Sequence, residues 1–355
     1  MNYDYNPFGG GDDFDYYGHM AVRDAKKAVS RTTLGLFLFG AVSTAVLLVI
    51  YLVLLITLGE EKYLELTTNP YFYIPMGTLA MYVIGFPLFL LCIKDLPTRR
   101  MHGGNTLTIP ELLATIPIMQ FAANIGSSIG TGFDGIMQEL FHTTSKDPVA
   151  TLTEGVPVWL MILITVIIAP ILEEFVFRKL IIDRLSVYGN VFAIIISAAL
   201  FGLFHGNLHQ MFYAFFIGLI LGYVTVKGGS WLWGVGLHMF MNFVNGALPS
   251  LLEEHFTGYE AAMIAFLEGD GDTFVANFES FMIAGSFAII ISALSIAGAI
   301  ILVYTATKRL IYVKNSPEAS IPLGKLPMVI FVNTGMLLFL LYVAFSIVNQ
   351  YIVLF

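Results

Sequence analysis

The chain has 355 residues, of which 57% are apolar and only 12% are charged, and its mean hydropathy is +0.81. A soluble domain usually has about a quarter of its residues charged, so this composition excludes an ordinary soluble domain and indicates an integral membrane protein. The net charge is −8, and nothing in the sequence resembles the basic stripe of a nucleic-acid-binding protein.

In chain order, residues 1–20 are rich in aspartate, tyrosine and glycine and are expected to form a disordered tail, which a basic segment follows up to residue 32. Apolar stretches then recur at lengths that can cross a bilayer, about 17–25 residues. They predict an all-α polytopic membrane protein with about nine transmembrane helices. The long stretches are 33–58, 71–93, 156–172, 281–306 and 327–355, and the shorter or more broken ones are 109–128, 190–205, 210–226 and 231–249.

The basic residues predict the orientation of these helices. With nine spans and a cytoplasmic N-terminus, 15 of the 17 Lys and Arg residues fall on the cytoplasmic side, as the positive-inside rule requires. We therefore expect the chain to be N-in and C-out. The segment 250–280 has many Glu and Asp residues but no Lys or Arg, and is expected to be an acidic outer loop.

Three groups of polar residues interrupt the apolar helices, and an ionisable side chain at bilayer depth points to a functional site. The groups are Glu173, Glu174 and Arg178 in APILEEFVFRKL, His205 in FGLFHGN, and His238 with Asn242 in GLHMFMN.

Each group also has a structural interpretation. Glu174 and Arg178 are four residues apart and can form an ion pair on one helix face, whereas Glu173 points about 100° away around the helix. His205 alone is expected to be a helix-end histidine bonded to the backbone, and the third group could form hydrogen bonds between helices. Taken together, three such groups within 70 residues favour one functional site.

The three motifs EExxxR, FxxxH and HxxxN, in this order, resemble those of the CPBP family of intramembrane proteases, also called the Abi family. This family includes type II CAAX prenyl proteases and bacteriocin-processing enzymes. The motif residues are Glu173, Glu174 and Arg178, then Phe201 and His205, then His238 and Asn242. The resemblance implies a catalytic core at 155–248. Composition and hydropathy divide the rest into an acidic tail and basic juxtamembrane segment at 1–32, transmembrane helices in 33–154, and an acidic outer loop with C-terminal transmembrane helices in 249–355.

The resemblance implies hydrolysis of a peptide bond, which needs an activated water, a proton for the leaving amine and stabilisation of a tetrahedral oxyanion. The roles it implies are a water-activating Glu173 with His205 beside it, His238 and Asn242 holding the water or the oxyanion, and Glu174 with Arg178 orienting Glu173.

The residues leave a metal open. Two histidines, His205 and His238, together with a carboxylate can bind zinc with an open fourth position. Neither HExxH nor a cysteine ligand set is present, and an acid/base site is chemically sufficient without metal, so we expect no tightly bound zinc.

The expected depths of the two histidines conflict with a shared site. On level, upright helices His205 would lie about 22 Å deep and His238 about 10 Å deep, so a shared site requires the fifth helix to tilt or to start deeper.

Two other classes remain as alternatives. A proton-coupled membrane transporter also uses intramembrane Glu and His, although paired inverted halves with broken helices are not evident in the sequence. A catalytically silent immunity or scaffold protein could share the fold. The substrate implied by the resemblance is a small membrane-associated or lipidated peptide or protein that enters from among the membrane lipids. We expect a plasma-membrane protein whose site opens to the cytoplasm.

Overall fold

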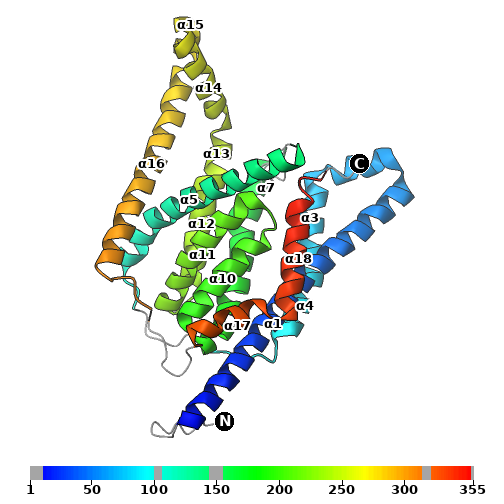
Figure 1. Cartoon of the computed structure of the whole chain (residues 1–355). Coiled ribbons are helices and arrows are strands. Elements are labelled where there is room, and N and C mark those ends of the chain that lie inside the picture. The colour runs from blue at the N-terminus through cyan, green and yellow to red at the C-terminus, as the bar shows by residue number, and fades with distance from the viewer. Residues whose placement is uncertain (1–10, 100–105, 144–154, 314–320, 353–355) are drawn as a thin grey trace. The chain divides into compact units, whose positions relative to one another are not determined.

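The computed structural model of the chain describes residues 11–99, 106–143, 155–313 and 321–352, with side chains from residue 20 onward (Figure 1). Within these ranges the regular structure is helical throughout and contains no strand. The prediction of an all-α polytopic membrane protein is therefore confirmed.

Six helical stretches in the described ranges are long and apolar enough to cross a membrane, and a seventh arises if Leu323–Phe331 and Thr334–Val348, bent by 65°, count as one span. The predicted helices at 190–205 and 231–249 exist as α10 (Asn190–Phe204) and α12 (Leu232–Asn242), but neither is among the six. The count of nine spans is therefore not confirmed. The six are Met20–Leu58, Pro70–Ile93, Ile109–Phe141, Val158–Tyr188, Leu208–Gly228 and Phe278–Thr307.

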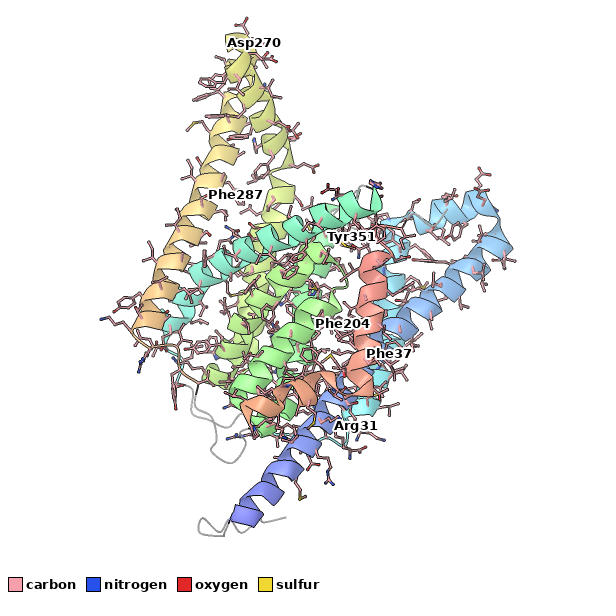
Figure 2. All side chains as sticks on the ribbon, in the orientation of Figure 1. Arg31, Phe37, Phe204, Asp270, Phe287 and Tyr351 are labelled. Carbon is pink, nitrogen blue, oxygen red and sulfur yellow. The ribbon has the colours of Figure 1, made fainter. Side chains whose placement is uncertain are left out.

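The chain forms two compact units, each assembled from separate parts of the sequence. In unit 1 (Met1–Arg100, Ile181–Ile196 and Lys314–Phe355), α4 and α18 pack against α1. Arg31 of α1, labelled in Figure 2, donates from Nε to the carbonyl oxygen of Cys92 at 2.6 Å and pairs with Asp95 at 3.2 Å. The elements of unit 1 are α1 (Gly11–Leu58), α2 (Glu60–Thr67), α3 (Pro70–Leu79), η1 (Ala80–Gly85), α4 (Phe86–Ile93), α9 (Ile182–Leu185), η4 (Ser186–Tyr188), η7 (Leu323–Lys325), α17 (Leu326–Phe331) and α18 (Thr334–Val348).

Unit 2 (Met101–Leu180 and Ser197–Val313) contains all the residues of the three motifs. Helix α5 packs along α11 and α16, and its N-terminus is held by a capping box between Thr108 and Glu111. A Cβ built on Gly130 would lie 2.5 Å from the carbonyl oxygen of Leu208, so only glycine allows α5 and α11 to approach so closely. Besides α12, the elements are α5 (Ile109–Phe141), α7 (Val158–Met161), η2 (Ile162–Ile168), α8 (Ala169–Glu174), η3 (Phe175–Ile181), α11 (Leu208–Gly228), η5 (Phe243–Ala247), α13 (Leu248–Leu251), α14 (Glu253–Glu268), α15 (Gly271–Ala276) and α16 (Phe278–Thr307).

Two segments are more helical than expected. Residues 11–20 are not a disordered tail but the first turns of α1, while residues 1–10 lie outside the described ranges. The acidic segment 250–280 is mostly helical, because its small and apolar residues recur at helical spacing and let α14 pack along α16. Asp270, at the turn between α14 and α15 (Figure 2), caps α15 by accepting the N–H of Thr273 at 3.1 Å. The Thr273 hydroxyl also donates to Asp270 at 2.6 Å. These two hydrogen bonds, the one from the hydroxyl first, lower the pKa of Asp270.

Candidate active site

The EExxxR motif lies within one helical stretch, Val158–Tyr188, in which α-helical and π-helical segments alternate. Segment η2 is π-helical before the motif, α8 carries the two glutamates, and η3 is π-helical again from Phe175. Single π-helical turns inside α-helices often occur at functional sites, because they leave backbone groups without their usual partners.

Pro170 gives this irregular helix a chemical consequence. In η2 the N–H of Ala169 bonds to the carbonyl of Ile164, five residues back. In the same register the carbonyl of Thr165 would accept from residue 170, but proline has no N–H. Asn242, 77 residues further along the chain, donates its Nδ2 to the Thr165 carbonyl oxygen at 2.8 Å instead. The last residue of the HxxxN motif is thus anchored by a carbonyl that Pro170 leaves free.

Glu174 and Arg178 form the predicted ion pair, and both side chains are completely buried. Glu174 Oε2 lies 3.2 Å from Arg178 Nε, and each side chain is 0% exposed. The guanidinium also lies over the ring of Phe201, 4.4 Å from its centroid, and its Nη2 is 3.5 Å from the carbonyl oxygen of Gly218. A buried ion pair is tolerable only when further partners compensate the lost hydration, and Phe201 and Gly218 are two of them here.

His238 is held by Glu174 and faces Glu173. Its Nδ1 lies 3.0 Å from Glu174 Oε1. Because the Arg178-paired carboxylate is an acceptor, Nδ1 donates, and the neutral ring keeps its lone pair on Nε2. That Nε2 lies 3.7 Å from Glu173 Oε2, and the Glu173 side chain is 28% exposed. The two adjacent glutamates therefore face opposite nitrogens of one imidazole: the buried Glu174 lies at hydrogen-bond distance, and the accessible Glu173 lies at 3.7 Å.

His205 is a helix-end histidine bonded to the backbone, as its structural interpretation predicts. Helix α10 ends at Phe204, one residue before His205. The backbone N–H of His205 bonds to the carbonyl of Gly202 and not to that of Phe201, so the Phe201 carbonyl has no helical partner. His205 Nδ1 satisfies that carbonyl at 2.8 Å. The chain then turns at Gly206, whose φ is +64°, and Asn207 caps α11. This structural role fixes the tautomer of His205 and leaves the Nε2 lone pair for chemistry.

Phe201 brings the two histidines together. Its ring centroid lies 4.9 Å from that of His205 and 5.7 Å from that of His238, both edge to face. The carboxylate of Glu173 is also close enough to interact electrostatically with His205. The mismatch in depth expected for level, upright helices does not keep the two imidazoles apart.

One expected contact is different in the structure. By resemblance, Glu174 and Arg178 would orient Glu173, whereas the Glu174 carboxylate contacts His238. The reason is geometric, since adjacent residues on a helix point about 100° apart. Glu174 and Arg178 therefore position His238, which faces Glu173, rather than Glu173 itself.

The sequence interpretation missed three neighbours of the motifs, namely Thr165, Gln120 and Asn245. Gln120, only 1% exposed on α5, exchanges hydrogen bonds of 3.0 and 3.1 Å with Asn245, which lies one turn beyond Asn242. A glutamine and an asparagine inside apolar runs were visible signals for this pair. Pro170 signals a carbonyl without a helical donor, but in the usual α-helical register that carbonyl would belong to Val166, so the sequence alone does not indicate Thr165.

The residues present do not fit a zinc site. A catalytic zinc needs three protein ligands, and the described part of the chain has no group of three or more His, Cys, Asp or Glu residues placed to hold a metal ion.

Comparisons with known proteins agree with this architecture. The family model for the type II CAAX prenyl endopeptidases, described as Rce1-like, matches residues 155–244, which include all three motifs. A protein of Bacillus subtilis (strain 168), named "Putative membrane peptidase YdiL", is 28% identical over 172 residues, which are 47% of this chain and 68% of that protein. No solved structure matches the chain. With its motifs on apolar helices, its match to this family model over residues 155–244 and its 28% identical relative, the chain is similar to the CPBP family of multi-pass membrane proteases.

Proposed function

We propose that the chain is an intramembrane endopeptidase in which Glu173 activates a water molecule against a peptide bond. The observation that carries this proposal is the pairing of Glu173 with His238. An accessible carboxylate lies 3.7 Å from the Nε2 of an imidazole whose other nitrogen is fixed by a buried carboxylate. Carboxylate, oriented imidazole and buried counter-charge are the groups that a general acid–base mechanism needs.

In the first step Glu173 takes a proton from water as the water oxygen attacks the carbonyl carbon of the substrate. The His205 Nε2 lone pair accepts the second hydrogen of that water and orients it. The carbonyl oxygen becomes an oxyanion, which accepts the second N–H of the Asn242 amide, since the first is held by Thr165. Fixing one N–H pre-organises the other, and such donors contribute strongly to catalysis.

In the second step the proton moves from Glu173 to His238 Nε2 and on to the nitrogen of the leaving amine. The C–N bond then breaks, giving a carboxylic acid and an amine and restoring both groups. His238 is positively charged while it carries this proton. The Glu174 carboxylate at 3.0 Å stabilises that charge, and Arg178 pairs with its second oxygen.

This mechanism uses no metal, in keeping with the donor set of the site. It predicts that purified, active protein carries well under one zinc per chain. His238→Ala and Asn242→Ala should each lower turnover by about 10²–10³, the scale of losing one oxyanion-hole donor. Stoichiometric zinc that is lost in His205→Ala and His238→Ala would overturn the metal-free mechanism, because zinc bound by these ligands must leave with them.

The substrate class we propose is a small membrane-associated or lipidated peptide or protein. The family model is that of CAAX prenyl endopeptidases, and the motif residues lie on apolar helices that a lipid-anchored chain can reach from within the bilayer. The basic residues favour a cytoplasmic N-terminus and a site that opens to the cytoplasm, and we propose the plasma membrane as its location.

Comparison of membrane-bound peptides from cells with the wild-type protein and with Glu173→Gln tests this function. Gln is isosteric with Glu but cannot accept the proton of water, so uncleaved substrates should accumulate and their products should disappear. Glu254→Gln on α14 is the matched control and should leave the peptide pattern unchanged. Identical patterns in all three strains would contradict the protease, and loss of a solute flux in Glu173→Gln vesicles would favour a transporter.

A further inference from the structure

Thr225 of α11 is a buried hydroxyl beside the candidate active site that no motif includes. It is 2% exposed, in a chain segment whose other buried residues are Gly, Ala and aliphatic. Thr225 follows Gly218 by seven residues and therefore lies on the same face of α11, two turns away. Gly218 is the residue whose carbonyl receives Arg178, so this face of α11 runs along the buried ion pair.

Gly234 of α12 shows what Thr225 faces. A Cβ built on Gly234 would lie 2.6 Å from Glu174 Oε2 and 3.4 Å from Thr225 Oγ1. The two oxygens therefore face the same small volume against the backbone of α12. Gly234 is also four residues before His238, on the same face of α12. Only glycine leaves room there for the carboxylate that holds His238.

Neither of these two oxygens, Glu174 Oε2 and Thr225 Oγ1, has a hydrogen-bond partner in the described part of the protein. Among the described residues, Thr225 Oγ1, Glu174 Oε2 and the Nε and Nη1 atoms of Arg178 are buried without a hydrogen-bond partner. The ion pair is close, at 3.2 Å, but is not aligned as a hydrogen bond. Buried donors and acceptors in folded proteins are almost always paired, and ordered water satisfies those that the protein does not. Glu174 Oε2 accepts hydrogen bonds and the Thr225 hydroxyl donates one, so a water molecule between them satisfies both.

We infer that Thr225 is a positioning residue, which together with Glu174 holds one buried water beside Gly234 and so fixes the carboxylate that orients His238. The Thr225 hydroxyl donates to the water, and the water donates to Glu174 Oε2. With Oε2 fixed in this way, Oε1 stays directed at His238 Nδ1. Thr225 acts only through Glu174, because it touches neither the reacting groups nor the expected position of the substrate. The inference rests on the proposed function only for its effect on turnover.

The test begins with Thr225→Val, which keeps the shape of the side chain and removes its hydroxyl, and Thr225→Ser, which keeps the hydroxyl. With the purified protein in lipid nanodiscs and a farnesylated CAAX-type peptide as probe, Thr225→Val should lower kcat about 10-fold, the value of one hydrogen bond to a charged network. KM should stay unchanged, because the interaction acts on the chemical step. Thr225→Ser should restore kcat. A rise in KM, or a loss that Ser does not restore, would overturn the inference.

Thr115→Val is the matched control, since Thr115 is a buried threonine of α5 whose hydroxyl bonds only to its own helix, at the Leu112 carbonyl. It should leave kcat unchanged. An equal loss of kcat in Thr115→Val would show that the effect of Thr225→Val is a general consequence of changing a buried threonine.

A second measurement does not depend on cleavage of any peptide. The thermal midpoint of unfolding is measured for Thr225→Val, Glu174→Gln and the double variant. A hydrogen bond to a carboxylate is about twice as strong as one to a neutral amide, so Thr225→Val should lower the midpoint less in the Glu174→Gln background. Additive shifts would overturn the inference. If wild-type protein leaves the peptide intact while the shifts are not additive, the proposed CAAX-type substrate fails and the water site stands.

Discussion

Replacing Pro170 by alanine is expected to lower kcat without lowering stability. The variant gains an N–H at position 170, which in the register of η2 reaches the carbonyl oxygen of Thr165. Asn242 Nδ2 occupies that oxygen at 2.8 Å and must then compete for it. Stability should hold or rise, because proline inside a helix is about 3 kcal/mol less favourable than alanine.

The size of the loss follows from the bond that is disturbed. A net hydrogen bond contributes about 0.5–1.5 kcal/mol, and each 1.36 kcal/mol is tenfold in rate. Pro170→Ala should therefore reduce kcat by about 2- to 13-fold, well below the factor of about 10²–10³ expected when an oxyanion donor is removed. Partial loss is expected because Asn242 remains and only its orientation is weakened.

The assay is the initial rate of cleavage of a farnesylated CAAX-type peptide by purified protein, with the thermal midpoint measured in parallel. Pro75→Ala, a proline inside α3 of unit 1, is the matched control and should keep the wild-type kcat. Wild-type kcat in Pro170→Ala would refute the reasoning, because it would mean that the orientation of Asn242 does not depend on the free Thr165 carbonyl. A thermal midpoint below that of the wild type would refute it as well, because the loss of kcat could then come from lost stability.

The remaining predictions concern topology and the buried ion pair. In a Cys92→Ala background, a cysteine at Glu60 should react with an impermeant thiol reagent added outside intact cells, whereas one at Thr98 should react only after permeabilisation; labelling of Thr98 from outside would reverse the orientation. Arg178→Leu should lower the free energy of unfolding by about 3–5 kcal/mol because it leaves the buried Glu174 charge unpaired. Adding Glu174→Leu should recover most of that loss in chemical unfolding, and no recovery would show that the pair is not coupled.

The helical class of the fold and the grouping of the motif residues were predictable from local patterns. Only helices and closed barrels satisfy their backbone hydrogen bonds inside a bilayer, so long apolar runs without alternating strand patterns predict helices. The spacing of four between Glu174 and Arg178 predicts their ion pair, and the structure confirms it. The end of α10 at His205 could be anticipated in the same way, since the bond to Phe201 lies within one turn.

The contacts that hold His238 and Asn242 could not be predicted, because they join residues far apart in the chain. Glu174 reaches His238 across 64 residues and Asn242 reaches Thr165 across 77. Sequence periodicity shows which residues share one face of a helix, but it does not show which other helix packs against that face. The segment 250–280 misled for another reason. Its acidic residues indicated a loop, yet α14 is exposed on one side and buries Ala262 and Ala265 on the other, which is how charged helices ordinarily pack.

The most direct test of the central claim compares cleavage of the farnesylated peptide by wild-type protein and by Glu173→Gln, with both shown to unfold at the same temperature. General base catalysis contributes about 10²–10⁴ to rate, so the account predicts a loss of kcat in that range with little change in KM. Glu254→Gln should retain full activity. A Glu173→Gln protein that cleaves the peptide at the wild-type rate would contradict the assignment of Glu173 as the group that activates water.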